Sequence, residues 1–389
     1  MRIALLAPLP PEQTGIADYA ANFRAALQGL DVVVETPLAG VGNDPEAALR
    51  RVAEVDWQGI ELVHAELGGG RLAEFAALGA LRQRFPELPL SATVHDPERL
   101  VWRRARLPWP LSLAARLPSP APQAATVLAD PLCLREEQRL AAGMNALITL
   151  TETGATHLRR RMRLPPERVH VIAHGNLIIP PRELPPLEPL RLLYFGFIYR
   201  GKGIEDLLDA LAEVVRENPE RAVRLTLAGG SAPEMAFGPG GSYLDELRAR
   251  IDGLGLGARI DWALDIPAES IPEVIQAHHV MVLPYRESKK LALLGAMRGT
   301  SGALSWAAAC GRGAITSDAR AFAEEVSRGN GAIFPQGDTK ALAERLRALC
   351  DQPELARTWA ENAQNIGLAR QWPRTAERFR ALFISLRKR

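Results

Sequence analysis

Two cations, Arg200 and Lys202, flank Gly201 in a segment that follows the apolar stretch 190–196 and precedes the amphipathic stretch 204–217. Free backbone N–H groups at the start of a helix attract anions, and fixed cations beside them strengthen that attraction. Glycines in such a loop let the backbone come close to a ligand. The pattern predicts a site for an anion such as a diphosphate, although basic loops on solvated turns are also common.

Histidines and acids follow apolar stretches in the first half of the chain as well. His95 ends the stretch 91–95, where an imidazole can donate a hydrogen bond to a hydroxyl group or accept its proton. A hydrogen-bonded structural histidine is the alternative. Asp96 either orients His95 or caps the following turn. For His64 and Glu66, which follow another apolar stretch, a structural role is favoured.

The elements that must position these residues alternate between short apolar runs and amphipathic helical stretches. Repeated β–α units of this kind predict an α/β protein with two Rossmann-like, doubly wound domains that face each other across a cleft. Ligands bind such sheets beyond the carboxyl ends of their strands. The expected strands are 3–7, 32–35, 62–65, 91–95, 146–149, 169–172, 190–196, 223–228, 259–263, 280–284, 314–316 and 331–334.

The prolines between Leu184 and Pro189 cannot join a helix or a central strand, so we expect the domain linker there. The prediction is an N-terminal domain over 1–184 and a C-terminal domain over 190–370. A last helix within 371–389 follows the complete second sheet and is free to pack back on the first domain.

Composition sets further limits. A chain of 389 residues with 47% hydrophobic and 24% charged residues is expected to form two ordinary globular domains. The formal net charge of +2 gives no field that favours nucleic acid as a partner. Its three cysteines lack metal-ligand spacing, which fits a reducing, cytoplasmic setting. No apolar stretch approaches the ~20 residues that span a bilayer.

Several motifs occur in the order found in a known family. The first half contains Gln13-Thr-Gly-Ile-Ala-Asp-Tyr19, Thr93-Val-His-Asp96 and Val171-Ile-Ala-His-Gly-Asn176. The second half contains Phe195-Gly-Phe-Ile-Tyr-Arg-Gly-Lys-Gly203, Leu227-Ala-Gly-Gly230, Val282-Leu-Pro-Tyr285, Ala309-Cys-Gly311 and the segment from Gly329 to Asp338. Through nearly its whole length the chain resembles the GT-B glycosyltransferases of the family 4 type, the glycosyl transferases group 1.

This resemblance implies that the chain transfers a hexose from a nucleotide-diphosphate sugar to an acceptor, with retention at the anomeric carbon, no metal and no cofactor. Arg200, Lys202 and His95 then take the catalytic roles. The donor diphosphate is expected to contact Gly15, Gly196, Arg200, Lys202, Thr300, Ser301 and Gly302. Sugar or acceptor contacts are expected from Thr14, Tyr19, Asp96 and His174, with a role in the linker as the alternative for His174.

The chain departs from the family pattern at two positions. The family commonly carries two glutamates, with seven residues between them, that contact the donor sugar and the ribose, whereas this chain has Arg298 and Trp306 there. Thr300, Ser301 and Gly302 still offer hydroxyl and N–H groups at a helix start. Glu287 is a further candidate for the missing carboxylate. The resemblance therefore leaves open whether the donor is a GDP- or a UDP-sugar.

The segment 102–117 mixes arginines with Trp102, Trp109 and leucines, a composition found at membrane surfaces. Because many enzymes of this resemblance use lipid-linked acceptors, it is a candidate for peripheral contact with the anionic inner leaflet. The alternative is that these residues cover the core of the first domain.

Three readings of function follow. The first is a retaining glycosyltransferase that acts on a saccharide or lipid-linked acceptor in cell-surface polysaccharide or glycolipid synthesis. The second is a non-catalytic partner subunit with the same fold. The third is another GT-B enzyme, such as a nucleotide-sugar epimerase or a phosphorylase, although no feature of the sequence specifically favours it.

Overall fold

The computed structural model describes residues 1–102, 107, 109–230, 237–238, 241–287 and 294–387. The chain folds into two compact units. The first contains Met1–Gly175, Lys289–Thr300 and Trp372–Arg389, and the second contains Asn176–Ser288 and Ser301–Gln371. The described residues 294–300 belong to the first unit, whereas 301–371 belong to the second.

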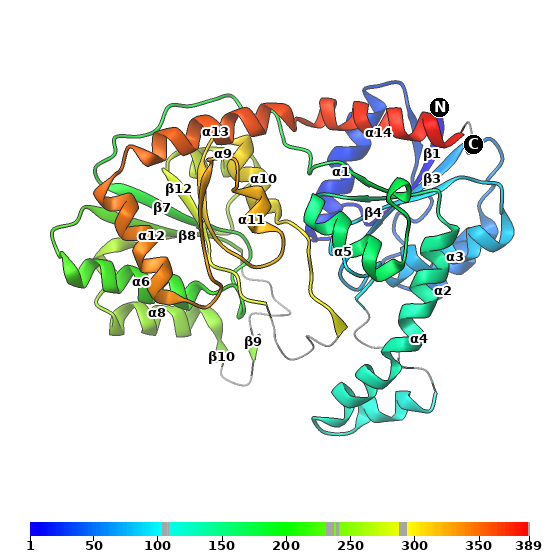
Figure 1. Cartoon of the computed structure of the whole chain (residues 1–389), viewed down its shortest axis with the longest axis horizontal. Helices are drawn as coiled ribbons and strands as arrows, with labels where there is room; N and C mark the ends of the chain where they lie inside the picture. The colour runs from blue at the N-terminus through cyan, green and yellow to red at the C-terminus, as the bar shows by residue number, and fades with distance from the viewer. Residues whose placement is uncertain (103–106, 108, 231–236, 239–240, 288–293, 388–389) are drawn as a thin grey trace. The chain divides into compact units, whose positions relative to one another are not determined.

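The first unit is built on a parallel six-stranded sheet of order β2-β1-β3-β4-β5-β6 (Figure 1). Its strands are β1 (Arg2–Leu6), β2 (Val33–Glu35), β3 (Leu62–Leu67), β4 (Leu90–Val94), β5 (Ala146–Thr149) and β6 (Val169–Val171). Its helices are α1 (Gly15–Gln28), α2 (Pro45–Glu54), α3 (Leu72–Arg84), η1 (Leu111–Arg116), α4 (Ala121–Gly143), α5 (Glu152–Met162), η2 (Pro166–Arg168) and α14 (Trp372–Arg387). The last of these packs against α1, where the rings of Phe23 and Phe379 lie 4.6 Å apart.

The second unit is built on a parallel six-stranded sheet of order β11-β8-β7-β12-β13-β14. Its strands are β7 (Leu190–Phe195), β8 (Val223–Gly229), β11 (Ile260–Leu264), β12 (Val280–Leu283), β13 (Gly313–Ser317) and β14 (Gly331–Phe334), beside a short antiparallel pair, β9 (Phe237–Gly238) and β10 (Gly241–Ser242). Its helices are α6 (Ile204–Glu217), α8 (Tyr243–Gly253), η3 (Gly257–Arg259), η4 (Ala268–Ser270), α9 (Ile271–Gln276), α10 (Gly302–Ala309), α11 (Phe322–Glu325), α12 (Thr339–Asp351) and α13 (Leu355–Ala369).

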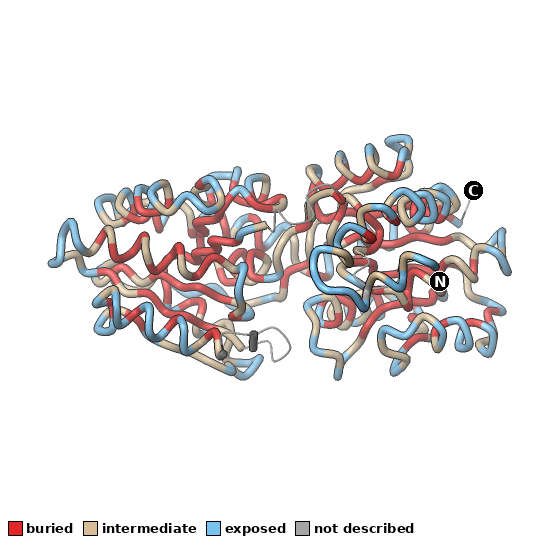
Figure 2. The backbone as a smooth tube through the Cα atoms, turned by 90° about the horizontal axis from the view of Figure 1, so that it is seen from below, coloured by how far each residue is buried: buried red, intermediate tan, exposed pale blue. Residues whose placement is uncertain are grey.

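The strands read as unbroken apolar runs because helices cover both faces of a parallel sheet. Figure 2 shows the buried positions along the strands and on the inner sides of the helices. In α6, for example, Leu207, Leu208 and Leu211 are fully buried. The two sheets confirm the prediction of doubly wound α/β architecture.

The sequence pattern did not predict the 23-residue helix α4, which contains Pro131 in its interior. A proline removes one main-chain donor and usually ends a helix, so the segment resembles an irregular connection. Figure 1 shows η1 and the first half of α4 standing apart from the sheet of their own unit. Among the described residues, no helix is both long and apolar enough to cross a membrane.

Candidate functional site

His95 follows the carboxyl end of β4, and a buried carboxylate from the neighbouring strand β3 holds its ring. Nε2 of His95 lies 2.8 Å from Oε2 of Glu66, whose side chain is completely buried. The other oxygen, Oε1, lies 3.3 Å from Nε2 of His64, which is also buried. The register of the parallel sheet, which pairs His64 with Ser91 and Glu66 with Thr93, brings these side chains together.

The pKa of Glu66 reflects this environment. Burial acts to raise it, but hydrogen bonds and charge interactions with His64 and His95 together hold it below its ordinary value. Glu66 is therefore a carboxylate at neutral pH. A buried carboxylate between two imidazoles was not predicted as part of the site.

Tyr19, from α1, lies almost completely buried against the same histidine. Its ring meets His95 edge-on at 4.7 Å, and it makes similar contacts with His174 at 5.0 Å and Trp372 at 4.9 Å. Burial and the Glu66 carboxylate raise the pKa of Tyr19 well above its ordinary value, so the hydroxyl group stays neutral. Only 2% of Tyr19 is exposed, and its ring supports His95.

The other first-unit candidates also have partners within their own unit. Thr14 is the N-cap of α1, and its hydroxyl oxygen accepts a hydrogen bond from the N–H of Ala17 at 3.0 Å. Gly15 has open space around it. One carboxylate oxygen of Asp96 accepts from the N–H of Gly69 at 3.1 Å. Nδ1 of His174 lies 2.7 Å from the carbonyl oxygen of Gly175, and its ring contacts Tyr19 and Trp372, which favours the structural alternative for this residue.

In the second unit, Lys202 lies over the face of Tyr285. Its ammonium nitrogen is 3.7 Å from the ring centroid, a cation–π contact. The hydroxyl of Tyr285 lies 3.5 Å from Oγ of Ser301, the N-cap of α10. Burial acts to raise the pKa of Tyr285, yet Lys202, Ser301 and Arg320 together lower it. One cation, one phenol and one helix start therefore gather beside Gly196, where an added Cβ would lie 3.6 Å from the Tyr285 hydroxyl.

Two glycines shape this loop. Gly203 has a φ of +70°, and an added Cβ would lie 1.8 Å from the carbonyl oxygen of Pro284. Gly196 has a φ of +134°. Residues with a Cβ rarely adopt either conformation, so glycine is required for the close approach of the loop to the end of β12.

Arg200 differs from Lys202 in its partners. Its guanidinium forms an ion pair with Glu246 and lies 5.4 Å from the ring centroid of Tyr243, on the exposed side of the loop. The two predicted cations therefore do not converge: Lys202 turns toward Tyr285 and α10, whereas Arg200 is paired near α8.

The positions of the expected glutamates hold other groups. Arg298 is half-buried, and its guanidinium has no ion-pair partner among the residues that the structure describes. Trp306 packs 6.4 Å from the ring of Phe195. The candidate replacement, Glu287, accepts a hydrogen bond from the N–H of Arg320 at 3.2 Å, so it holds the end of β13 in place.

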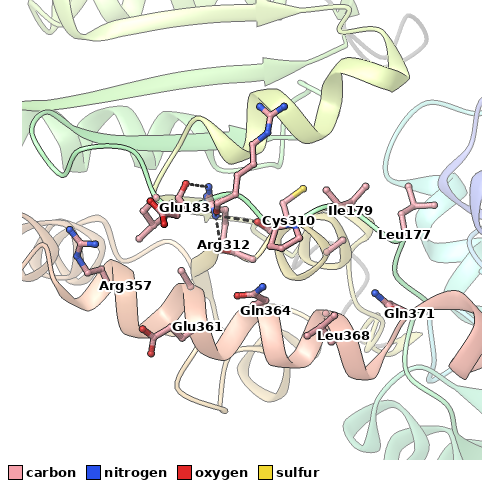
Figure 3. Close-up of a pocket in the computed structure, with 17 residues that line it drawn as sticks. Leu177, Ile179, Glu183, Cys310, Arg312, Arg357, Glu361, Gln364, Leu368 and Gln371 are labelled. Carbon is pink, nitrogen blue, oxygen red and sulfur yellow. Dashed lines mark hydrogen bonds between the residues drawn. The ribbon is translucent and has the colours of Figure 1, made fainter.

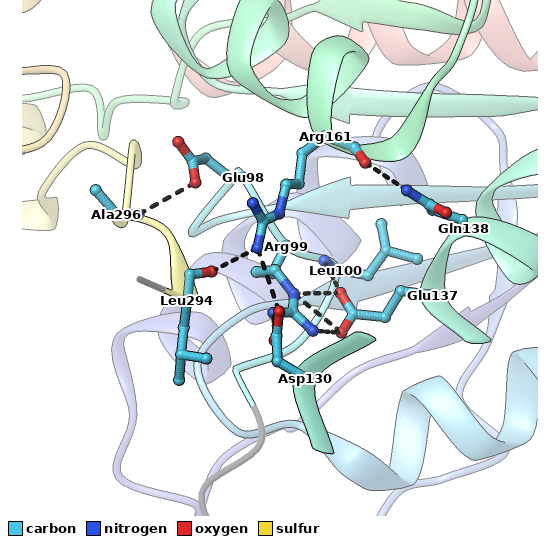
Figure 4. Close-up of polar contacts among 9 residues, drawn as sticks. All are labelled: Glu98, Arg99, Leu100, Asp130, Glu137, Gln138, Arg161, Leu294 and Ala296. Carbon is cyan, nitrogen blue, oxygen red and sulfur yellow. Dashed lines mark hydrogen bonds and ion pairs between the residues drawn. The ribbon is translucent and has the colours of Figure 1, made fainter. Parts of the chain in front are cut away.

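The segment 294–300 is anchored on the loop that carries His95 (Figure 4). Arg161 donates to the carbonyl oxygen of Leu294 at 3.0 Å, and Glu98 accepts from the N–H of Ala296 at 3.2 Å. Further along, the N–H of Arg298 donates to the carbonyl oxygen of Pro97. This segment leads directly to Thr300, Ser301 and Gly302, the predicted phosphate contacts.

Arg99, one of the basic residues near the predicted membrane segment, is not part of an exposed patch. It is 5% exposed and pairs with Glu137 and Asp130, which lie on α4 (Figure 4). These pairs fasten α4 to the His95 loop. Arg103, Arg104 and Arg106 lie outside the described residues.

The second unit also contains a cavity of about 400 Å³ at the amino ends of β12 and β13, opposite the strand ends that carry the predicted site (Figure 3). The connecting segment 177–184, Cys310–Arg312 and α13 line it. Buried Arg312 donates to the carbonyl oxygens of Arg182 and Glu183 and to four other carbonyls. Burial lowers its pKa to about 10. Arg312 therefore fastens the connecting segment to the second unit.

Glu66 and Tyr285 are the residues that sequence reasoning missed. The local sequence favours a structural role for Glu66, because nothing in it shows that this carboxylate reaches His95. In the sequence, Tyr285 is marked only as the last residue of the motif Val282-Leu-Pro-Tyr285. Its position after the strand β12 was the available signal, since ligands gather beyond strand ends.

Comparisons with known proteins are consistent with this geometry. Residues 178–366 match the family described as glycosyl transferases group 1. An alpha-D-kanosaminyltransferase from Streptomyces kanamyceticus is 26% identical over 322 residues, which are 79% of this chain and 72% of that protein. A D-inositol 3-phosphate glycosyltransferase from Corynebacterium kroppenstedtii is 26% identical over 255 residues, but the match spans only 53% of that relative's length.

Solved structures support the fold. Sucrose-phosphate synthase from Thermosynechococcus elongatus superposes with a TM-score of 0.72 at 19% identity, covering 99% of both chains. The Anabaena protein HepE, solved in complex with UDP, superposes with a TM-score of 0.68 at 18% identity and covers 99% of this chain and 100% of its own. These similarities confirm the predicted GT-B fold class.

Proposed function

We propose that the chain is a glycosyltransferase that transfers a hexose from a nucleotide-diphosphate sugar to an acceptor, a proposal supported by the match of residues 178–366 to the glycosyl transferases group 1 family. The observation that carries the proposal is the cluster of Lys202, Tyr285 and Ser301 at the start of α10. It joins a cation, hydroxyl groups and free N–H groups, which together suit a diphosphate.

The chemistry of the reaction gives this cluster its role. When the bond between the anomeric carbon and the diphosphate breaks, negative charge builds on the leaving phosphate. A fixed cation and helix-start N–H groups stabilise that charge more in the transition state than in the bound donor. Lys202 is the central group, and Arg200 contributes from the loop edge after exchanging its Glu246 partner for the donor.

Nucleotide recognition in this proposal rests on the same unit. The structural neighbour HepE binds UDP, so a UDP-sugar is the first donor to test and a GDP-sugar the second. Because Arg298 and Trp306 replace two family glutamates, the contacts to the sugar and the ribose differ from the usual ones. We propose that the reaction retains the anomeric configuration, as the family resemblance implies. Because Lys202 and α10 neutralise the diphosphate, the proposed reaction needs neither a metal nor a cofactor.

His95 is the proposed contact to the reacting sugars from the first unit. A saccharide or a lipid-linked acceptor presents hydroxyl groups, and an imidazole at the end of β4 can bind one of them. We further propose that the enzyme acts in cell-surface polysaccharide or glycolipid synthesis at the cytoplasmic side of the membrane.

A direct assay tests the proposal. The protein is incubated with a panel of UDP- and GDP-sugars and simple acceptors, and the released nucleoside diphosphate and the glycosylated product are measured. Transfer from one donor supports the proposal. Absence of both binding and transfer with every donor would favour the non-catalytic alternative.

We also propose peripheral membrane contact through 102–117. Five large apolar residues of η1 and the first half of α4, or just before them, are more than half exposed: Trp109, Leu113, Leu117, Leu128 and Leu132. Arg116 adds a positive charge beside them. An exposed apolar surface with a cation suits an anionic lipid surface.

The membrane proposal has its own test. Wild-type protein should co-sediment with liposomes that contain anionic lipid at low salt, and a variant with Trp109, Leu113 and Leu117 changed to serine should not. Equal behaviour of the two proteins, or no binding by the wild type, refutes the contact.

A further inference from the structure

Glu66 has an environment that packing alone does not explain. Its side chain is completely buried, and among the described residues its charged or polar partners are the imidazoles of His64 and His95. Buried carboxylates usually pair with an arginine or a lysine, as Glu137 pairs with Arg99 in the same unit. A carboxylate held between two titratable rings is instead the arrangement that orients and polarises an imidazole.

The hydrogen bonds fix which ring nitrogens carry protons. The hydroxyl of Ser91 donates to the carbonyl oxygen of Val63, so its oxygen accepts from Nδ1 of His64 at 2.9 Å. Nε2 of His64 lies 3.0 Å from the hydroxyl of Thr93. Because a carboxylate can only accept, the proton between His95 and Glu66 belongs to Nε2 of His95.

This assignment leaves Nδ1 of His95 as an acceptor. No partner for that atom is found among the residues that the structure describes, and 11% of the side chain is exposed. The ring cannot easily turn, since Tyr19 packs against it edge-on. A Cβ on Gly68 would approach Cβ of His95 to 2.9 Å, and one on Gly299 would lie 2.1 Å from its carbonyl oxygen.

We propose that Glu66 is a positioning residue that acts through His95: it holds the Nε2–H tautomer so that Nδ1 accepts a hydrogen bond from a hydroxyl group of a substrate sugar. This inference rests on the proposed glycosyl transfer. The negative charge of Glu66 makes Nδ1 a stronger acceptor, and the ring of His64, locked by Ser91 and Thr93, lies 3.3 Å from the other carboxylate oxygen.

Glu66→Gln separates charge from hydrogen bonding. The amide oxygen can still accept from His95, and the amide nitrogen can donate to neutral His64, so the packing and the fold are kept. The expected result is a fall in kcat/KM of about 10–100-fold with nucleoside diphosphate affinity unchanged. The matched control is Glu74→Gln, which alters an equally buried carboxylate that pairs with Arg71 on α3, and it should keep wild-type turnover.

A double-mutant cycle with His95→Ala shows whether the effect of Glu66→Gln on kcat/KM depends on His95. A purely structural role of Glu66 would not give this dependence. Glu66→Gln should cost nothing further in the His95→Ala background. In proton NMR, the Nε2–H of His95 should give a slowly exchanging downfield signal that shifts in Glu66→Gln and disappears in His95→Ala. Absence of that signal from the wild-type protein contradicts the hydrogen bond itself.

Two failures remain distinguishable. A wild-type protein that transfers no sugar from any donor overturns the proposed function, and with it the substrate contact of His95. An active enzyme in which Glu66→Gln stays within twofold of wild type, or costs the same with and without His95, overturns the inference about Glu66 alone.

Discussion

At the scale of single residues, Lys202 is the group on which the proposed chemistry depends most. It lies half-buried over Tyr285 at the start of α10, where no carboxylate neutralises it among the described residues. Lys202→Ala should lower kcat by about 10²–10³-fold, because it removes one fixed charge that stabilises the leaving diphosphate. Steady-state kinetics would measure this, with Lys340→Ala on the exposed start of α12 as the control. Turnover within threefold of wild type in Lys202→Ala would refute the assignment.

The lowered pKa of Glu66 predicts a pH dependence of stability. A carboxyl group whose pKa is lower in the folded state stabilises the fold fully above its unfolded pKa, near 4.5, and this contribution disappears as the pH falls through the folded pKa. Glu66→Gln lacks the titrating group. Urea unfolding from pH 6.5 to pH 3 should show the wild type losing more free energy of unfolding than the variant below about pH 4.5. Parallel curves would contradict the pKa direction.

The sequence indicates individual reactive residues better than it indicates their partners. His95 and Lys202 were predicted because each stands alone at the end of an apolar run, which is a local signal. The link between Glu66 and His95 depends on the pairing of β3 with β4, across 29 residues. The ion pair between Arg200 and Glu246 likewise depends on how α8 packs, so no local pattern could show that the two cations have different partners.

At the scale of elements, the segment that connects the two sheets is fastened by buried side chains of the second unit. Arg312 donates to carbonyls in Arg182 and Glu183, Gln276 donates to the carbonyl of Pro180, and His279 contacts the carbonyl of Pro185. The prolines keep this segment out of helices and strands. Its carbonyl groups must therefore accept hydrogen bonds from side chains elsewhere in the unit.

Arg312→Met tests this anchoring. The thioether can fill the space but cannot donate, so several buried carbonyls lose their partner, and the free energy of unfolding should fall by about 2–4 kcal/mol. Arg357→Met is the matched control, since Arg357 lines the same cavity but, within the part of the chain that the structure describes, its ion pair is with exposed Glu354 alone. Urea unfolding measures both, and equal stability of Arg312→Met and wild type would show that the anchoring is dispensable.

The strands were easier to predict than the unit to which a given segment belongs. Each strand of a parallel sheet is an apolar run, so twelve expected strands agree with the structure to within about two residues. The helix α4 was not predicted because of Pro131, and the association of 294–300 with the first unit could not be predicted from the sequence. That association depends on Arg161 and Glu98, which are more than 130 residues away.

At the scale of the whole molecule, the two units provide different halves of one proposed reaction. The second unit contains the anion cluster of Lys202, Tyr285 and Ser301, and the first contains His95 with Glu66. A ligand that binds only one folded unit raises the stability of that unit by mass action, and ~2.7 kcal/mol is expected at one hundred times its dissociation constant. Nucleoside diphosphates should therefore raise the unfolding temperature of the second unit.

A thermal-shift panel makes this prediction specific. UDP or GDP should raise the melting temperature by several degrees, whereas the matching nucleoside should not, because the diphosphate supplies the charge that Lys202 meets. The shift should persist in EDTA, since the proposed site neutralises the diphosphate with a side chain and a helix start rather than a metal ion. It should be lost in Lys202→Ala but kept in Glu66→Gln and His95→Ala, whose changes lie in the other unit. Loss of the shift in EDTA would contradict metal independence, and loss in His95→Ala would show that donor binding depends on the first unit.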